Sequence, residues 1–139
     1  MSKIIRIFTD GGSRGNPGPA ASGAVLKELV GGELGETIAT AEKFLGETTN
    51  NQAEYTAIVI GLEKAKELGA KHVEVHMDSE LATKQLNGEY KVKDVQIAKR
   101  FLEVKNLMHS FVSVKFKHIR REYNKEADAI VNKVLDEQE

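Results

Sequence analysis

The stretch from residue 4 to residue 18 constrains the fold more than any other part of the sequence. It reads IIRIFTDGGSRGNPG, a run of β-branched and aromatic residues followed by an acid and a glycine-rich segment. Apolar residues at both odd and even positions predict a strand that is buried on both faces. The pattern therefore places Asp10 at the end of a buried strand, next to backbone that glycines leave bare. A hairpin turn in which Asp10 accepts nearby amide hydrogens is the simplest explanation.

The composition favours one soluble domain. With 139 residues, 40% apolar and 29% charged, the chain is large enough for a single core. It has no cysteine, which excludes disulfides, thiolate metal sites and cysteine nucleophiles. No apolar run is long enough to span a bilayer, and the N-terminus does not have the pattern of a signal peptide. We expect a single domain over residues 1–139, located in the cytoplasm and not bound to a membrane.

Basic residues are concentrated in one part of the chain. The formal net charge is −1, but ten of the 20 Lys and Arg residues lie between Lys91 and Lys125. A solvated surface explains this clustering without any function. The alternative is an electrostatic footprint for nucleic acid.

Strand and helix patterns alternate along the rest of the chain. The predicted strands cover residues 20–30, 38–44, 71–77 and 112–119, and the predicted helices cover 48–68, 80–86, 95–109 and the segment that Asn124 caps. Gly31-Gly32 indicates a hairpin between the second and third strands. In the last strand, Val112, Val114 and Phe116 share the apolar face. The order β-β-β-α-β-α-α-β-α predicts an α/β fold, a mixed sheet with helices on both faces.

Four acids share one description. Asp10 and Asp78 follow strands, whereas Glu54 and Asp128 lie in the first turns of helices. Each has an ordinary explanation alone, as a turn residue, a helix cap or a charge that complements the helix dipole. A helical crossover between the first and fourth strands makes them parallel, and the carboxyl ends of parallel strands meet at one edge of a sheet. All four side chains can converge there.

Such a cluster needs a counter-cation. Four carboxylates in a small volume repel one another and are costly to bury at neutral pH. Ligation by oxygen atoms alone suits Mg²⁺ or Mn²⁺ rather than Zn²⁺. Two such ions about 4 Å apart form the clamp that enzymes use for in-line displacement at phosphorus.

The segments that carry these acids resemble the four signature blocks of type 1 ribonuclease H. They read FTDGGSRGNPGPA from Phe8, TTNNQAE from Thr48, MDS from Met77 and NKEAD from Asn124, in the order of the family. The resemblance implies a ribonuclease H-like fold with a five-stranded mixed sheet, and endonucleolytic cleavage of the RNA strand of RNA/DNA hybrids. It also implies two ions, Mg²⁺ with Mn²⁺ as the alternative, held by Asp10, Glu54, Asp78 and Asp128, with Asp10 as the bridge.

The resemblance extends to substrate contacts. Asn16, Asn50 and Asn51 match minor-groove readers of the family, the Gly11 backbone matches a position near the RNA 2′-hydroxyl, and Thr49 matches a contact to a DNA phosphate. Amides suit this role because they bond both base edges and 2′-hydroxyls, which distinguish RNA from DNA. Turn formation and helix capping are the structural alternative for these residues.

The chain departs from the family pattern in two loops. Glu80 stands where the family often has glutamine, so one groove contact is in doubt. The loop before Asp128 usually offers a histidine that assists turnover. Here either His118 or Arg121 could serve, and the spacing does not decide between them. A plain polar role at the strand end is the favoured interpretation of His118.

A long basic protrusion is missing from the middle of the chain. The segment from Gly88 to Asp94 is short, and the chain has no tryptophan. We expect a short form of the enzyme without a separate N-terminal hybrid-binding domain. Its affinity for hybrids should be modest and salt-sensitive, and should depend on Lys91, Lys93, Lys99 and Arg100.

Two other functions remain open at this point. A related polynucleotidyl transferase or junction resolvase would use the same carboxylates, although the Asn50-Asn51 pair and the basic segment favour hybrids. A non-enzymatic hybrid-binding module is disfavoured, because a pure binder has no need to gather negative charge near phosphates. We expect a monomer with no obligate protein partner.

Overall fold

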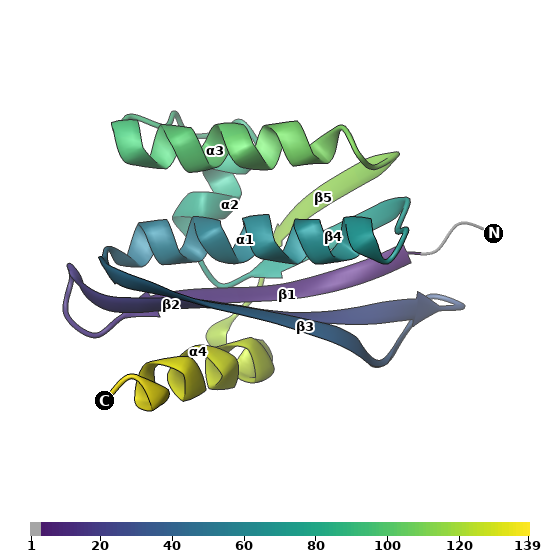
Figure 1. The fold of residues 1–139 in the computed structure, drawn as a ribbon. Coiled ribbons are helices and arrows are strands. Elements are labelled where there is room, and N and C mark those ends of the chain that lie inside the picture. The colour runs from purple at the N-terminus through teal and green to yellow at the C-terminus, as the bar shows by residue number, and fades with distance from the viewer. Residues whose placement is uncertain (1–3) are drawn as a thin grey trace.

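A computed structural model describes residues 4–139, and Figure 1 shows a single sheet with helices on both faces. The strands are β1 (Ile4–Ser13), β2 (Gly18–Val30), β3 (Glu33–Thr48), β4 (His72–Met77) and β5 (Ser113–His118). The helices are α1 (Asn50–Glu67), α2 (Glu80–Leu86), α3 (Val95–Met108) and α4 (Lys125–Glu137), with a short 3₁₀ turn at Arg121–Tyr123. The predicted order of elements and the mixed sheet are confirmed.

The strand order is β3-β2-β1-β4-β5. The pairs β1–β2 and β2–β3 are antiparallel, whereas β1–β4 and β4–β5 are parallel. The parallel β1–β4 pair was predicted from the helical crossover between these strands. The hairpin between β2 and β3 turns at Gly31 and Gly32, whose φ angles of 60° and 82° suit glycine. The parallel β1–β4 ladder ends with Thr9 opposite Met77, which matters for the site described below.

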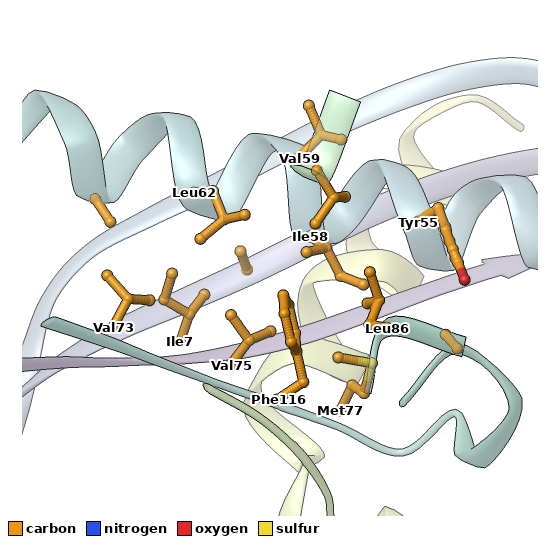
Figure 2. Packing of buried hydrophobic residues seen from close by; sticks show 14 of the residues in the cluster. Ile7, Tyr55, Ile58, Val59, Leu62, Val73, Val75, Met77, Leu86 and Phe116 are labelled. Carbon is orange, nitrogen blue, oxygen red and sulfur yellow. The ribbon is translucent and has the colours of Figure 1, made fainter. Parts of the chain in front are cut away.

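The main core lies between the sheet and α1, α2 and α3, while α4 covers the opposite face (Figure 1). Figure 2 shows Ile58 and Leu62 of α1 packed with Ile7 of β1 and Val75 of β4, all fully buried. Gly61 allows this close approach, because a Cβ there would lie 2.9 Å from Ile7 Cγ2. The small residues Ala57, Gly61 and Ala65 of α1 are all buried.

The strand boundaries differ from the prediction in three places. β1 continues to Ser13, because its last residues still pair with β2, so Asp10 lies inside an antiparallel ladder opposite Gly23 and not in a hairpin turn. β3 is longer than the predicted 38–44. Val112 was expected on the buried face of the last strand, but it lies before β5, in a turn where its N–H bonds to Lys71 O. Its side chain is 72% exposed.

No helix within residues 4–139 is long and apolar enough to cross a membrane.

Candidate active site

The register of the parallel pair places two of the four acids next to each other. Asp10 and Asp78 directly follow the last paired residues, Thr9 and Met77, on neighbouring strands. Neighbouring strands lie about 4.8 Å apart, so Asp10 and Asp78 lie side by side where the β1–β4 ladder ends. Asp78 does not cap α2. That role belongs to Ser79, whose hydroxyl accepts the Ala82 N–H at 3.2 Å.

The start of α1 brings Glu54 to the same edge. Thr49 caps the helix and accepts the Gln52 N–H at 3.2 Å. The first turn lies directly on β1 and β2, because Ser22 Oγ donates to Ala53 O at 2.6 Å. Gly11 is required beneath this turn, since any Cβ there would collide with the Ala53 carbonyl. The hydrogen bond from Ser22 and the close approach of Gly11 therefore hold the residue before Glu54 against β1 and β2.

The first turn of α4 brings Asp128 to the edge through Asn124. Asn124 was predicted to cap α4, but its side chain makes no capping hydrogen bond. Its Nδ2 instead donates to Thr9 O at 2.8 Å, and the residue is 1% exposed. Its own carbonyl accepts the Asp128 N–H at 3.1 Å. One buried amide thus connects the residue before Asp10 with the turn that holds Asp128.

All four predicted acids line one open cavity of about 430 Å³. Its lining comprises Asp10, Gly11, Gly12, Ser13, Arg14, Asn50, Glu54, Asp78, Arg121, Asp128, Val131, Asn132 and Leu135. The side chains come from the edge of the sheet, from α1 and from α4, and they are far apart in the sequence. The structure therefore brings together the carboxylates that the sequence pattern singled out.

The cavity disfavours the charged forms of Asp10 and Glu54. Burial raises the pKa of Asp10 to about 8, and the neighbouring Asp78 and Asp128 carboxylates add to the shift. Burial also raises the pKa of Glu54, while the Ser79 hydroxyl and the charge of Arg121 oppose that shift. A bound cation would reverse this balance, because it stabilises every neighbouring carboxylate in its ionised form.

The residues fit a hard divalent cation by their chemistry. Four carboxylates give the all-oxygen donor set that Mg²⁺ and Mn²⁺ prefer. Within the described residues, no three histidine, aspartate or glutamate side chains already converge as the ligands of one ion. The fit therefore depends on the type of donor and on the excess of negative charge.

A second cavity, of about 550 Å³, adjoins the first. It lies between the starts of α1 and α3, and its lining includes Asn16, Thr49, Asn50 and Asn51, all predicted substrate contacts, together with Glu54, Asp94 and Gln96. Asn50 and Glu54 line both cavities, so the two lie side by side. Gly11, the remaining predicted contact, lines the acidic cavity.

Several of these polar residues also brace the local backbone. Asn50 Oδ1 accepts the Ser13 N–H at 2.8 Å, and Asn16 Oδ1 accepts the Asn50 N–H at 3.1 Å. Thr49 is the helix cap described above. The structural roles considered from the sequence are therefore real for these three residues, and they fix the amides beside the acidic cavity. Asn51 is exposed.

The structure separates the two candidates in the loop before α4. Arg121 lines the acidic cavity and acts on the pKa of Glu54. His118 is exposed and is not among the residues of that lining. Glu80 is also exposed and pairs with Lys84 at 3.3 Å, one turn along α2.

Asn132 and Arg14 also line the acidic cavity, although the sequence pattern did not single them out. Asn132 Nδ2 donates to Asp128 Oδ2 at 3.3 Å, a contact that its position one helical turn after Asp128 could have indicated. Arg14 lines the cavity from the loop after β1. The sequence feature that could have indicated Arg14 is its position as the one basic residue within the glycine-rich segment.

A mixed sheet with carboxylates from β1, α1, α4 and the end of β4 at one edge defines the class of ribonuclease H-like proteins. A family model described as reverse transcriptase-like matches residues 8–134. The sequence is 39% identical to ribonuclease HI of Halobacterium salinarum over 96% of this chain and 65% of that protein. It is 37% identical to a bifunctional protein of Mycobacterium tuberculosis over 96% of this chain and 36% of that protein.

Solved structures agree with this assignment. The crystal structure of LC11-RNase H1 in complex with an RNA/DNA hybrid has a TM-score of 0.89 and 40% identity, and the match covers 96% of this chain and 98% of that one. The chain belongs to the type 1 ribonuclease H family. It spans about two thirds of the archaeal relative and about a third of the mycobacterial one.

Proposed function

We propose that this protein is an endoribonuclease that cleaves the RNA strand of RNA/DNA hybrids by two-metal-ion phosphodiester hydrolysis. The observation that carries the proposal is the convergence of Asp10, Glu54, Asp78 and Asp128 on one cavity that lies beside an amide-lined cavity. The first arrangement suits chemistry at phosphorus, and the second suits recognition of base edges and 2′-hydroxyls. Two of the relatives described above support the proposal, since one is named ribonuclease HI and the other is an RNase H1 solved in complex with an RNA/DNA hybrid.

The four acids would hold two Mg²⁺ ions, or Mn²⁺ ions, with Asp10 shared between them. When bound, such ions supply Lewis-acid stabilisation of the phosphoryl oxygens and an activated water. The protein provides the fixed geometry. The Thr9–Asn124 hydrogen bond sets the separation of β1 and α4, and Asn132 orients the Asp128 carboxylate.

Arg121 and the amide-lined cavity complete the proposed site. Arg121 contributes a positive charge beside Glu54, where it would stabilise the negative charge that develops on the phosphate during cleavage. We therefore assign the turnover-assisting role to Arg121 in preference to His118. Asn16, Asn50 and Asn51 would read the minor groove of the hybrid, with Thr49 close to the DNA strand. All four acids belong to one chain, so the site requires no partner copy, and we propose a cytoplasmic monomer.

A substrate panel tests this proposal. Hybrid, duplex RNA, duplex DNA and a four-way DNA junction, each with one labelled strand, are incubated with Mg²⁺ or Mn²⁺. We expect fragments only from the RNA strand of the hybrid, and none with EDTA or with Asp10→Asn. Glu36→Gln, which removes an exposed carboxylate on β3, is the matched control and should cleave normally.

The same panel separates the alternatives. Cleavage of the junction would support a resolvase, and binding of the hybrid without cleavage would support a non-enzymatic module. Full activity of the Asp10→Asn protein would refute the assignment of the metal site.

A further inference from the structure

We propose that Arg14 binds a backbone phosphate of the RNA strand, and that two acids at the end of the chain, Asp136 and Glu139, hold it until the substrate arrives. This inference rests on the proposed function and adds a substrate contact to it. Arg14 and Arg121 are the basic residues in the lining of the acidic cavity. Neither Asp136 nor Glu139 belongs to that lining.

The backbone at Arg14 is held in a fixed position beside the acidic cavity. Arg14 directly follows β1, and its N–H bonds to Pro19 O at 2.9 Å. Gly15 has a φ of 93°, which favours glycine, and a Cβ at Gly18 would collide with the Arg14 carbonyl. The loop is therefore closely packed around Arg14, and its side chain starts from a defined position.

The guanidinium of Arg14 is paired, but weakly. Nη2 lies 2.7 Å from Asp136 Oδ1, and Nη1 lies 2.6 Å from Glu139 Oε1. The Arg14 side chain is 36% exposed, and both acids are more exposed than that. Ion pairs this exposed contribute little to stability and are screened by salt. Arg14 can therefore exchange these carboxylates for another anion at little cost.

A phosphate is the anion that this position suits. The planar guanidinium, which here pairs with two carboxylates, also matches phosphate oxygens in a bidentate manner. The four acids of the cavity repel the phosphates of an approaching nucleic acid, and the positive charge of Arg14 in the cavity lining offsets this repulsion. Arg14 also follows Ser13, which bonds to Asn50, and precedes Asn16, which lines the amide cavity. Arg14 thus lies where a strand would pass from the amide-lined cavity to the acidic one.

Binding of a labelled hybrid, measured by fluorescence anisotropy between 50 and 200 mM salt, tests the proposal. All proteins carry Asp10→Asn, so that binding is measured without cleavage. We expect Arg14→Gln to weaken binding about three- to tenfold, and to reduce the slope of log Kd against log salt by about one. The pair Asp136→Asn with Glu139→Gln should tighten binding about two- to fivefold, because it releases Arg14. This gain should vanish when Arg14→Gln is added.

Matched controls separate a specific contact from a general charge effect. Lys133 and Glu42 form another exposed pair, between α4 and β3, at 3.3 Å and outside both cavities. Lys133→Gln makes the same charge change as Arg14→Gln, and Glu42→Gln combined with Glu36→Gln makes the same change as the acid pair. Both controls should alter Kd less than twofold. Arg14→Lys keeps the charge but loses the fork, and should bind between the wild type and Arg14→Gln.

Two results would overturn the inference. One is an Arg14→Gln protein, folded by circular dichroism, with unchanged Kd and salt slope. The other is a gain from the two acid substitutions that persists in the Arg14→Gln background. Either result leaves the proposed function intact if the wild-type protein still cleaves the hybrid, whereas absence of cleavage by the wild type would overturn the proposed function itself.

Discussion

Replacing Asp10 by asparagine should stabilise the protein in the absence of divalent cations, although it removes the proposed catalytic centre. The pKa of Asp10 is raised from 3.8 to about 8, chiefly by burial and by Asp78 and Asp128. Between these values the folded chain holds a proton that the unfolded chain has lost. The free energy of unfolding therefore falls as the pH rises through this window.

The size of the effect follows from this proton. One additional proton on the folded chain lowers the free energy of unfolding by about 1.4 kcal/mol for each pH unit. From pH 4.5 to pH 7.5 the limit is about 4 kcal/mol. Asparagine has nearly the same shape and does not titrate, so we expect Asp10→Asn to gain about 2–4 kcal/mol at pH 7.5, or about 6–14 °C in Tm.

Urea denaturation in EDTA at several pH values measures this difference. Other groups titrate in the same range. Burial lowers the pKa of His76 to about 4, for example, which makes the protein more stable as the pH rises from about 4 to about 6.5. The difference between wild type and Asp10→Asn cancels such contributions. The stability gap should widen with pH, and Mg²⁺ should close it by stabilising the wild type alone. Parallel stability profiles for the two proteins would refute the electrostatic account of the cavity.

Three further predictions concern the scaffold and the loop before α4. Asn124→Ala should lower the free energy of unfolding, measured by urea denaturation, by about 2–3 kcal/mol, because it leaves the buried Thr9 carbonyl without its donor. A loss below about 0.5 kcal/mol would contradict that role. Gly11→Ala should lower the free energy of unfolding by about 3 kcal/mol in the same assay. Gly12→Ala, whose Cβ would meet only side-chain atoms at 3.8 and 4.0 Å, should be tolerated, and equal losses would contradict the close approach of α1. In steady-state hybrid cleavage, Arg121→Gln should lower kcat about tenfold while His118→Ala changes it less than twofold, and the reverse order would return the assisting role to His118.

Much of the fold could be predicted because local patterns and the final packing agree. The alternation in β4, the small-residue face of α1 and the Gly31-Gly32 hairpin each determine one element without help from distant residues. Boundaries were less predictable. β1 and β3 extend beyond their apolar runs because backbone pairing with β2 continues through polar and glycine residues, which carry little strand signal.

The convergence of the four acids could be predicted because Asp10 and Asp78 follow neighbouring parallel strands, while Glu54 and Asp128 lie in the first turns of helices that can start at the same place. The contacts that hold them could not. Asn124 has the sequence of a helix cap, and only the packing of α4 on β1 shows that its amide bonds to Thr9 O. Arg14 has the sequence of a turn residue, and only the position of the last turn of α4 shows its two acidic partners. Such roles depend on residues more than 100 positions away, which no local pattern records.

Calorimetric titration of Mg²⁺ and Mn²⁺ into the wild type and four single variants tests the central claim most directly. The variants are Asp10→Asn, Glu54→Gln, Asp78→Asn and Asp128→Asn, with Glu36→Gln as the control. If the four carboxylates form one cation site, each of the four variants weakens cation binding and the control does not. Four variants that bind cations as tightly as the wild type would show that these acids, although neighbours in the fold, do not act together.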